Sequence, residues 1–283
     1  MTLRIATYNV HKGFSQFNRR LVVHELRSHL RLIDADIVFL QEVHGSNTRH
    51  AARFADWPDE PQYEFLADQV WPEFAYGRNA VYDHGDHGNA LLSRYPIVSV
   101  HNQDVSGHRF ESRGLLHCAI ALPGVAQALH CFCVHLALGE RSRKMQIGAV
   151  IERIRGEVPA GAPLILAGDF NDWRNRAGHR LQHELGLREA FRDIKGGRPA
   201  RSFPALFPLL RLDRIYLRGF EVQALESFGI TSFNGGAVAK TEQEIIELAV
   251  SLRAGRGVVD LAQIEPLPGE VVGEAARLWI SEH

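Results

Sequence analysis

The chain has few cysteines, and this shortage limits which class of protein it can be. Its 283 residues include three cysteines, Cys118, Cys131 and Cys133, and each lies within an apolar, strand-like run. A small, odd number of cysteines in such runs indicates reduced core thiols rather than a disulfide framework, and this favours a cytoplasmic protein. A Cys-x-Cys metal site is the alternative, but the sequence has no second pair to complete it.

Long apolar segments, repeats and low-complexity linkers are also missing. No apolar run approaches membrane-spanning length, and a strand-like pattern begins at Leu3. We therefore expect neither a transmembrane segment nor a secretory signal. The economical prediction is one domain up to about residue 230, in a protein that is a monomer. A hydrophobic content of 45% and a charged content of 23% are ordinary for a globular protein with a sizeable core.

The chain has little net charge, but its charges are unevenly distributed. The formal net charge is −1, whereas from Arg174 to Arg218 there are eleven basic and four acidic residues, a local excess of 11 − 4 = +7. Such a segment is commonly a solvated surface. It would also attract an anionic substrate.

One apolar run ends in polar residues that suit phosphate chemistry. Pro163 opens this run, and residues 164–168 are short enough for a buried strand. Asp169 and Asn171 follow at the carboxyl end, and residues two apart in an extended segment point to the same side. A carboxylate beside a carboxamide can hold a water and a phosphate oxygen, or a hard cation. The alternative is an ordinary exit from a strand, where Asp and Asn are common.

The N-terminal part predicts two parallel strands with a helix between them. Residues 3–8 read as a buried strand that leads to Asn9. Apolar residues between Val22 and Ile33 recur at helical spacing. Residues 37–40 predict the second strand, which Glu42 follows closely. The order strand, helix, strand favours a parallel pair joined by a crossover.

The rest of the chain predicts further strands and helices. Residues 45–78 read as loop-rich. His84–Gly88 reads as a tight turn with exposed histidines, and a zinc cluster is the alternative. A lone histidine at a strand end, such as His135, is more often structural than catalytic. We expect strands at residues 97–103, 114–122, 127–134, 211–217 and 258–264, and helices at residues 142–155, 241–255 and 270–280.

Several short motifs stand in one order between Tyr8 and Ile215. They are Tyr8-Asn9, Gln41-Glu42, Gly88-Asn89, Leu92-Ser93-Arg94, Arg113, Val134-His135-Leu136, Gly168-Asp169-Phe170-Asn171 and Leu212-Asp213-Arg214-Ile215. In this order they resemble the endonuclease/exonuclease/phosphatase superfamily of metal-dependent phosphoesterases. The resemblance implies an α/β (α+β) fold over residues 1–230, a four-layer αββα sandwich of two mixed β-sheets flanked by helices. It also implies hydrolysis of a phosphate ester with Mg²⁺, or with Mn²⁺ in its place.

The residue types suit this chemistry. Cleavage requires neutralised phosphoryl oxygens and a water in line with the leaving group. Glu42 suits Mg²⁺, which takes one or two carboxylates and keeps several waters, and Asn9 would assist at the metal or the phosphate. Asp169 would orient or deprotonate the water, and Asn171 would hold a phosphoryl oxygen. His135 would donate to a non-bridging oxygen.

Two further residues are candidates for substrate binding. Asn89 follows a glycine in one of the motifs above. Arg113 would either contact phosphate or brace Glu111, and we favour the second interpretation.

The C-terminal part departs from the family pattern. Asp213 resembles the carboxylate that orients a second catalytic histidine, which the family supplies in a Ser-Asp-His tripeptide near the C-terminus. Ser-Asp-His occurs nowhere in this chain, and the nearest match, Ser281-Glu282-His283, makes His283 the candidate. Residues 231–283 have no counterpart in the family, and an insertion, a replaced terminus or a truncation would each explain them.

Two functional hypotheses follow. The first is a Mg²⁺-dependent phosphodiesterase or phosphatase. Its substrate would be nucleic acid, which the basic segment favours, or a phospholipid headgroup or other small phosphoester, if the apolar residues 203–210 stand beside the site rather than pack on the core. A pI near 7.0 lacks the basic footprint of a sequence-independent nucleic-acid binder. The second hypothesis is a catalytically impaired binding or regulatory protein on the same fold, because Ser-Asp-His is missing.

Overall fold

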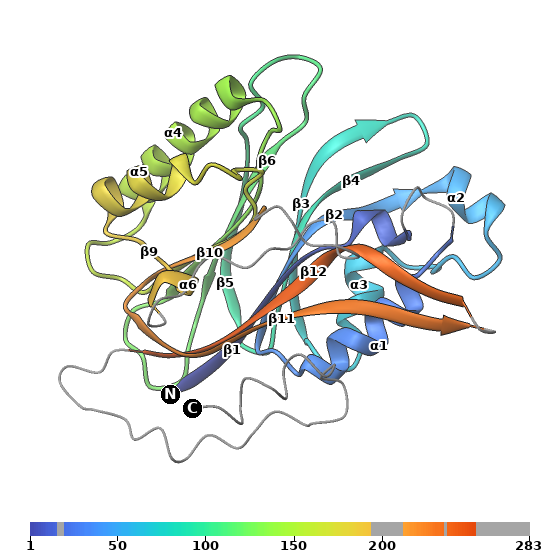
Figure 1. The fold of residues 1–283 in the computed structure, drawn as a ribbon, viewed down its shortest axis with the longest axis horizontal. Helices are drawn as coiled ribbons and strands as arrows, with labels where there is room; N and C mark the ends of the chain where they lie inside the picture. Colours follow the sequence, from blue (N-terminus) through green and yellow to red (C-terminus); the bar gives the residue numbers. More distant parts are fainter. Residues whose placement is uncertain (16–19, 194–211, 235–236, 253–283) are drawn as a thin grey trace. The chain divides into compact units, whose positions relative to one another are not determined.

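Two six-stranded sheets make up most of the computed structural model of the protein (Figure 1). The structure describes residues 1–15, 20–193, 212–234 and 237–252. The strands of the first sheet are β1 (Thr2–Asn9), β2 (Ile37–Asn47), β3 (Glu73–Tyr82), β4 (Gly85–Ser93), β11 (Phe220–Asn234) and β12 (Ala237–Leu252). The strands of the second sheet are β5 (Ile97–Asp104), β6 (Gly114–Ile120), β7 (Leu129–His135), β8 (Leu164–Asp169), β9 (Arg188–Glu189) and β10 (Asp213–Arg218).

Both sheets are mixed. The spatial orders are β11–β12–β1–β2–β4–β3 and β5–β6–β7–β8–β10–β9. In each sheet one central pair is parallel, β1 with β2 and β7 with β8, and the other pairs are antiparallel. Since parallel strands end at the same sheet edge, each pair brings two carboxyl ends together.

Helices cover the outer faces of the two sheets. The helices are α1 (Val23–Ile33), α2 (Thr48–Arg53), α3 (Gln62–Ala67), α4 (Glu140–Glu157), α5 (Arg176–Leu185) and α6 (Ala190–Asp193), with a 3-10 turn η1 (His11–Gly13). Apolar residues of α1 and α3 pack with the outward residues of β1, β2 and β4. Those of α4 and α5 pack with the outward residues of β7 and β8. The fold is therefore a four-layer αββα sandwich, as the sequence predicted.

The buried strands explain why two sheets can pack face to face. In β1, Ile5 faces the core between the sheets and Ala6 faces the helices, and Phe39 and Val38 divide in the same way in β2. Strands buried on both faces are apolar at every position, which is the pattern that identified them in the sequence. The core between the sheets also holds the three cysteines, which are free and buried. Burial raises the pKa of Cys133 to about 12, so this thiol stays protonated.

Most predicted elements are present, and three predictions are corrected. Residues 45–78, which read as loop-rich, hold more regular structure than that: β2 continues to Asn47, and α2, α3 and the start of β3 follow. Six-residue helices are too short to show an apolar period. His84–Gly88 is not a free turn, because Gly85–Gly88 belongs to β4 and both His84 and His87 are partly buried.

The third correction concerns residues 241–255, where we predicted a helix. Residues 237–252 form strand β12, which pairs with β1 from Thr2↔Ser251 to Thr7↔Ile246 and with β11 on its other side. Pairing with an otherwise open edge of β1 outweighs the capping pattern at Thr241, which is a weak local preference. Up to Leu252 the described residues form one compact unit.

Several predictions lie outside the described residues. These are the apolar loop 203–210, the strand 258–264, the helix 270–280 and His283. In the part of the chain that the structure describes, no helix has the length and apolar character to cross a membrane.

Candidate active site

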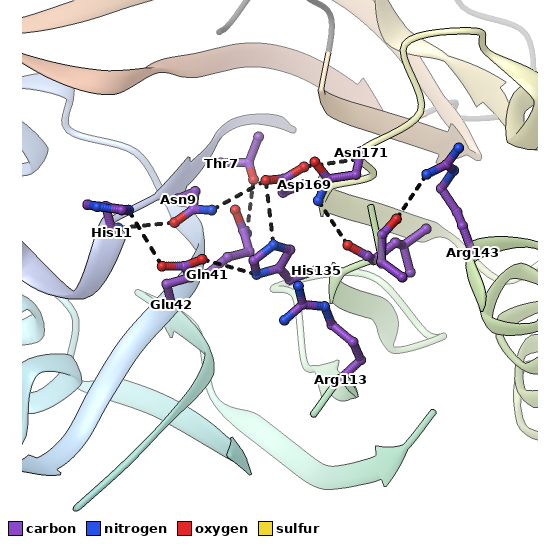
Figure 2. A network of polar contacts seen from close by, with 12 residues as sticks. Thr7, Asn9, His11, Gln41, Glu42, Arg113, His135, Arg143, Asp169 and Asn171 are labelled. Carbon is purple, nitrogen blue, oxygen red and sulfur yellow. Dashed lines mark hydrogen bonds and ion pairs between the residues drawn. The ribbon is translucent and has the colours of Figure 1, made fainter. Parts of the chain in front are cut away.

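The carboxyl ends of the two parallel strand pairs place five polar side chains in one network (Figure 2). Asn9 pairs with Gln41 at the end of β1 and β2, and His135 pairs with Asp169 at the end of β7 and β8. A hydrogen bond from Asn9 Nδ2 to Asp169 Oδ2, of 3.3 Å, links the two sheets at this end. Glu42 and Asn171 join Asn9, His135 and Asp169 to make the five. The network therefore spans both sheets.

Asp169 lies at the centre of this network. It is 2% exposed. Its Oδ1 accepts from the backbone N–H of Asn171 at 3.0 Å, and its Oδ2 lies 3.7 Å from His135 Nε2. These contacts orient the carboxylate from three sides.

Asn171 reaches the site by a route that differs from the predicted one. We predicted that Asp169 and Asn171 point to the same side of an extended segment, but β8 ends at Asp169 and Asn171 has a φ of +48°. Its side-chain Nδ2 donates to Leu136 O at 2.9 Å. A tight turn, rather than strand alternation, thus holds the two residues together.

Glu42 occupies a bulge in β2. The register between β2 and β4 shifts between Leu40 and Val43, and Glu42 has a φ of +55°. This conformation is uncommon for a residue other than glycine and is often found where a bulge redirects a side chain near a functional site. The bulge aims the carboxylate at His135 rather than letting it alternate with its neighbours.

Basic side chains surround the Glu42 carboxylate. His11 Nδ1 and Lys12 Nζ each lie 3.7 Å from Oε2, and His135 Nδ1 lies 3.9 Å from Oε1. Burial alone would raise the pKa of Glu42, but the neighbouring basic side chains of His135, Lys12, His11 and His87 outweigh it, so that the pKa is lower than usual. Glu42 is therefore ionised at neutral pH.

His135 is neutral in this environment. Burial lowers its pKa, and the nearby Arg113 lowers it further, although Asp169 and Glu42 act in the opposite direction. A neutral imidazole carries one N–H donor and one acceptor. His135 can therefore donate a hydrogen bond without first losing or gaining a proton.

Asn89 and Arg113 lie at different depths. Asn89 is 1% exposed, and its Nδ2 donates to Gly114 O at 3.0 Å and Cys133 O at 3.3 Å, which ties β4 to the second sheet. Arg113 is half-buried beside His135 in Figure 2. The Oε2 of Glu111 accepts from Gly107 N at 2.7 Å and Gln146 Nε2 at 2.8 Å, so these groups brace Glu111.

Asp213 is fully buried beside the site. It is the first residue of β10 and pairs directly with Asp169 of β8. His283, the candidate partner that the sequence suggested, lies outside the described residues.

Comparisons with known proteins identify the family. The sequence matches the model of the Endonuclease/Exonuclease/phosphatase family over residues 6–235. The chain belongs to this family. It is 51% identical over 223 residues to the protein YbhP of Escherichia coli strain K12, and the match covers 79% of this chain and 87% of YbhP.

Solved structures of the family share the fold. One is an endonuclease/exonuclease/phosphatase from Beutenbergia cavernae, with a TM-score of 0.70 and 20% identity over 89% of this chain and 72% of that one. Another is a mannosyl-6-phosphatase from Bacteroides thetaiotaomicron, with a TM-score of 0.66 and 16% identity over 88% of this chain and 100% of that one. At such identities the likeness concerns the fold.

The family motifs did not identify every residue of the network. His11 and Lys12 follow Asn9 in η1, and His87 lies in β4 within electrostatic reach of Glu42. Two basic residues between the end of a strand and Gly13 were a sequence signal that could have indicated these members of the site. His87 was missed because the His84–Gly88 stretch resembled a turn.

The residues around Glu42 fit a hard divalent cation. Glu42 Oε2 is buried and has no hydrogen-bond partner, while the carboxylate is ionised and lies within 4.0 Å of three basic side chains. Asn9 Oδ1 accepts only from His11 N, at 3.0 Å, among the described residues, which leaves a lone pair free. Within the same part of the chain no group of three or more His, Cys, Asp or Glu is arranged to hold a metal ion. One carboxylate and one amide oxygen suit Mg²⁺, which retains several waters.

Proposed function

We propose that the protein is a metal-dependent phosphoesterase that hydrolyses its substrate with a water activated at Asp169. The observation that supports this most strongly is the convergence of Asn9, His135 and Asn171 on one buried carboxylate, opposite the ionised Glu42. Glu42 and Asn9 would hold Mg²⁺, or Mn²⁺ in its place. When bound there, the metal would neutralise charge on the phosphoryl and leaving oxygens.

The chain's own residues supply the remaining functions. Asp169 orients the attacking water and accepts its proton, and its Oδ2 lies 3.7 Å from His135 Nε2. His135 donates an N–H to a non-bridging phosphoryl oxygen, where negative charge grows in the transition state. Asn171 gives one amide N–H to Leu136 O and keeps its second for another phosphoryl oxygen.

The other predicted residues take supporting roles. Arg113, beside His135, would contact the phosphate. Asn89 would position the site by joining the sheets rather than touch the substrate, because it is buried and its Nδ2 donates to backbone carbonyls. Asp213 would orient a histidine, for which His283 is the candidate. The three free buried thiols favour a cytoplasmic protein, and we propose that it acts as a monomer.

The test is hydrolysis of bis(p-nitrophenyl) phosphate by the purified chain in Mg²⁺, Mn²⁺ or EDTA. Turnover should require the metal, and Asp169→Ala and His135→Ala should each lower kcat by roughly a hundredfold or more, the usual contribution of a general base or of a donor that stabilises transition-state charge. Arg155→Ala, on the exposed surface of α4, is the control and should not change kcat. Metal-independent turnover, or full activity in Asp169→Ala, would contradict the proposal.

A binding or regulatory protein on the same fold is the second candidate. The observation that favours it is the lack of a Ser-Asp-His tripeptide, the family's source of a histidine for Asp213. Under this hypothesis the intact chain should bind plasmid DNA or lipid vesicles in EDTA, yet turn over neither these nor the chromogenic ester when Mg²⁺ is restored. Metal-dependent turnover that His135→Ala abolishes would exclude it.

A further inference from the structure

A second polar site lies beside the network, between α2 and the turn that joins β3 to β4. A cavity of about 380 Å³ is lined there by Arg49, His50, Arg53 and His84, which we call the arginine pocket. All four residues are basic. Its volume falls within the range of small-ligand sites.

The walls of the arginine pocket are fixed by hydrogen bonds. Thr48 N and Thr48 Oγ1 donate to the carbonyl of His84 at 2.9 and 3.3 Å, which fastens α2 to the β3–β4 turn. The side chain of Asn47 caps α2 by accepting from His50 N at 2.9 Å. Arg49 and Arg53 are four residues apart and therefore lie on one face of the helix. The pocket is thus held in place before any ligand arrives.

The side chains that line the arginine pocket carry positive charge. Neither Arg49 nor Arg53 forms an ion pair with an acidic residue in the described part of the chain. Arg53 instead lies over the Phe54 ring, 5.3 Å from its centroid. Burial lowers the pKa of His50, and Arg53, His84 and Arg49 lower it further. The lining groups therefore repel one another, and an anion would relieve this repulsion.

A row of histidine rings connects the arginine pocket with the candidate active site. The His50 and His44 centroids are 5.5 Å apart, and those of His44 and His87 are 6.2 Å apart. His87 in turn lies within electrostatic reach of Glu42. Lys12, 3.7 Å from Glu42, is also within electrostatic reach of His50. The arginine pocket and Glu42 are therefore close together, at the two ends of this row of rings.

We propose that the arginine pocket binds a second phosphate group of the substrate while the scissile phosphate lies at Glu42 and Asp169. Arginine guanidinium groups bind phosphate oxygens through paired, charge-assisted hydrogen bonds. The substrate is then one that carries at least two phosphates, either successive phosphates of an oligonucleotide or those of a small bisphosphate. This inference rests on the proposed function for its reaction, but the binding can be measured without turnover.

The test compares Arg49→Ala/Arg53→Ala with a matched control, Lys144→Ala/Arg155→Ala, which removes two positive charges from the exposed surface of α4. Binding is measured in EDTA. Fluorescence polarisation reports on a short fluorescein-labelled oligothymidylate, and calorimetry reports on thymidine 3′,5′-bisphosphate and thymidine 5′-monophosphate. The pocket variant should bind the oligonucleotide, the bisphosphate or both roughly tenfold or more weakly than wild type, the scale of losing a charged hydrogen bond. The control should lose much less.

The outcomes separate the two possible substrates from each other and from the proposed function. Weakened binding of the oligonucleotide alone would identify a polymer, and weakened binding of the bisphosphate would identify a small molecule. Hydrolysis of bis(p-nitrophenyl) phosphate, which has one phosphate, should keep its kcat/KM in the pocket variant. If that hydrolysis is absent while the affinity loss remains, the proposed function fails and the pocket stands. If both double variants bind alike, or if the wild type binds neither multi-phosphate probe, the pocket is overturned.

Discussion

Backbone strain gathers at the candidate site. Seven residues other than glycine have a positive φ in the described chain. Four of them, His11, Lys12, Glu42 and Asn171, belong to the network or adjoin it. Such conformations cost of order 1–3 kcal/mol each and persist where surrounding contacts enforce them. The sequence identified Glu42 and Asn171 by residue type, but the bulge and the tight turn that aim them depend on the neighbouring strand and could not be predicted.

Glu42→Gln tests the metal assignment. The variant keeps the size of the side chain but removes the charge that attracts a cation, so the Mg²⁺ concentration for half-maximal hydrolysis should rise by roughly tenfold or more. Activity should be titrated against Mg²⁺ for wild type, Glu42→Gln and the control Arg155→Ala. An unchanged Mg²⁺ requirement in Glu42→Gln would remove Glu42 from the metal site.

His117 should make stability depend on pH. It is 3% exposed in β6, its Nε2 lies 3.0 Å from His130 Nδ1, and burial lowers its pKa from 6.5 to about 3. The unfolded chain therefore binds this proton more readily, so stability is fully present above pH 6.5 and is lost as pH falls from 6.5 toward 3. The loss approaches about 1.4 kcal/mol per pH unit.

The measurement is urea unfolding of wild type, His117→Gln and the exposed control His108→Gln between pH 7 and about pH 4, the range over which this linkage acts. His117→Gln should show a flatter dependence of the unfolding free energy on pH, whereas His108→Gln should follow wild type. Equal slopes in all three proteins would show that His117 is not held neutral.

Among the secondary-structure elements, those with an internal signal were predictable and those that depend on a partner were not. The apolar runs of β1, β7 and β8 and the periodic faces of α1 and α4 identified them. Strand β12 was mistaken for a helix, because its preference is decided by the edge of β1 with which it pairs. The sequence of a single segment does not show whether such a partner edge will be present.

Gly168 controls how closely β7 and β8 approach. Its φ is +140°, and a Cβ added there would lie 2.0 Å from the carbonyl oxygen of Val134. Gly168→Ala should therefore lower the free energy of unfolding by about 2 kcal/mol or more and displace the adjoining Asp169.

Gly124→Ala is the matched control for this substitution. Gly124 also has a positive φ, of +72°, but no atom within 4 Å of an added Cβ, so the control reports backbone strain alone. Thermal and urea unfolding should show a larger loss for Gly168→Ala. Losses of equal size would mean that the contact with Val134 is unimportant.

For the whole molecule, the extent of the first sheet sets where the chain can be shortened. Shortening the chain to residues 1–230 would remove β12 and leave β1 with an unpaired edge, whereas residues 1–252 retain every pairing of that sheet. We expect the 1–252 protein to unfold cooperatively and the 1–230 protein to be aggregated or to unfold at a lower temperature. Circular dichroism melting and size-exclusion chromatography of both would decide. Comparable melting of the two would show that β12 contributes little.

The family and the layer order were predictable because the motifs lie at strand ends spread along the chain. The position of η1 and the row of His50, His44 and His87 were not, since they arise only when β2 and the β3–β4 hairpin meet.

The hydrogen bond between Asn9 and Asp169 joins one sheet to the other, and this has a consequence for how the protein could be divided. Neither sheet holds all the groups of the proposed reaction: Asn9 and Glu42 come from one, His135 and Asp169 from the other. Two fragments that divide these residues between them would each be inactive. Activity would return only when the fragments bind each other through the apolar core between the sheets. In the proposed function, the packing of the two sheets against each other and the formation of the active site therefore occur together.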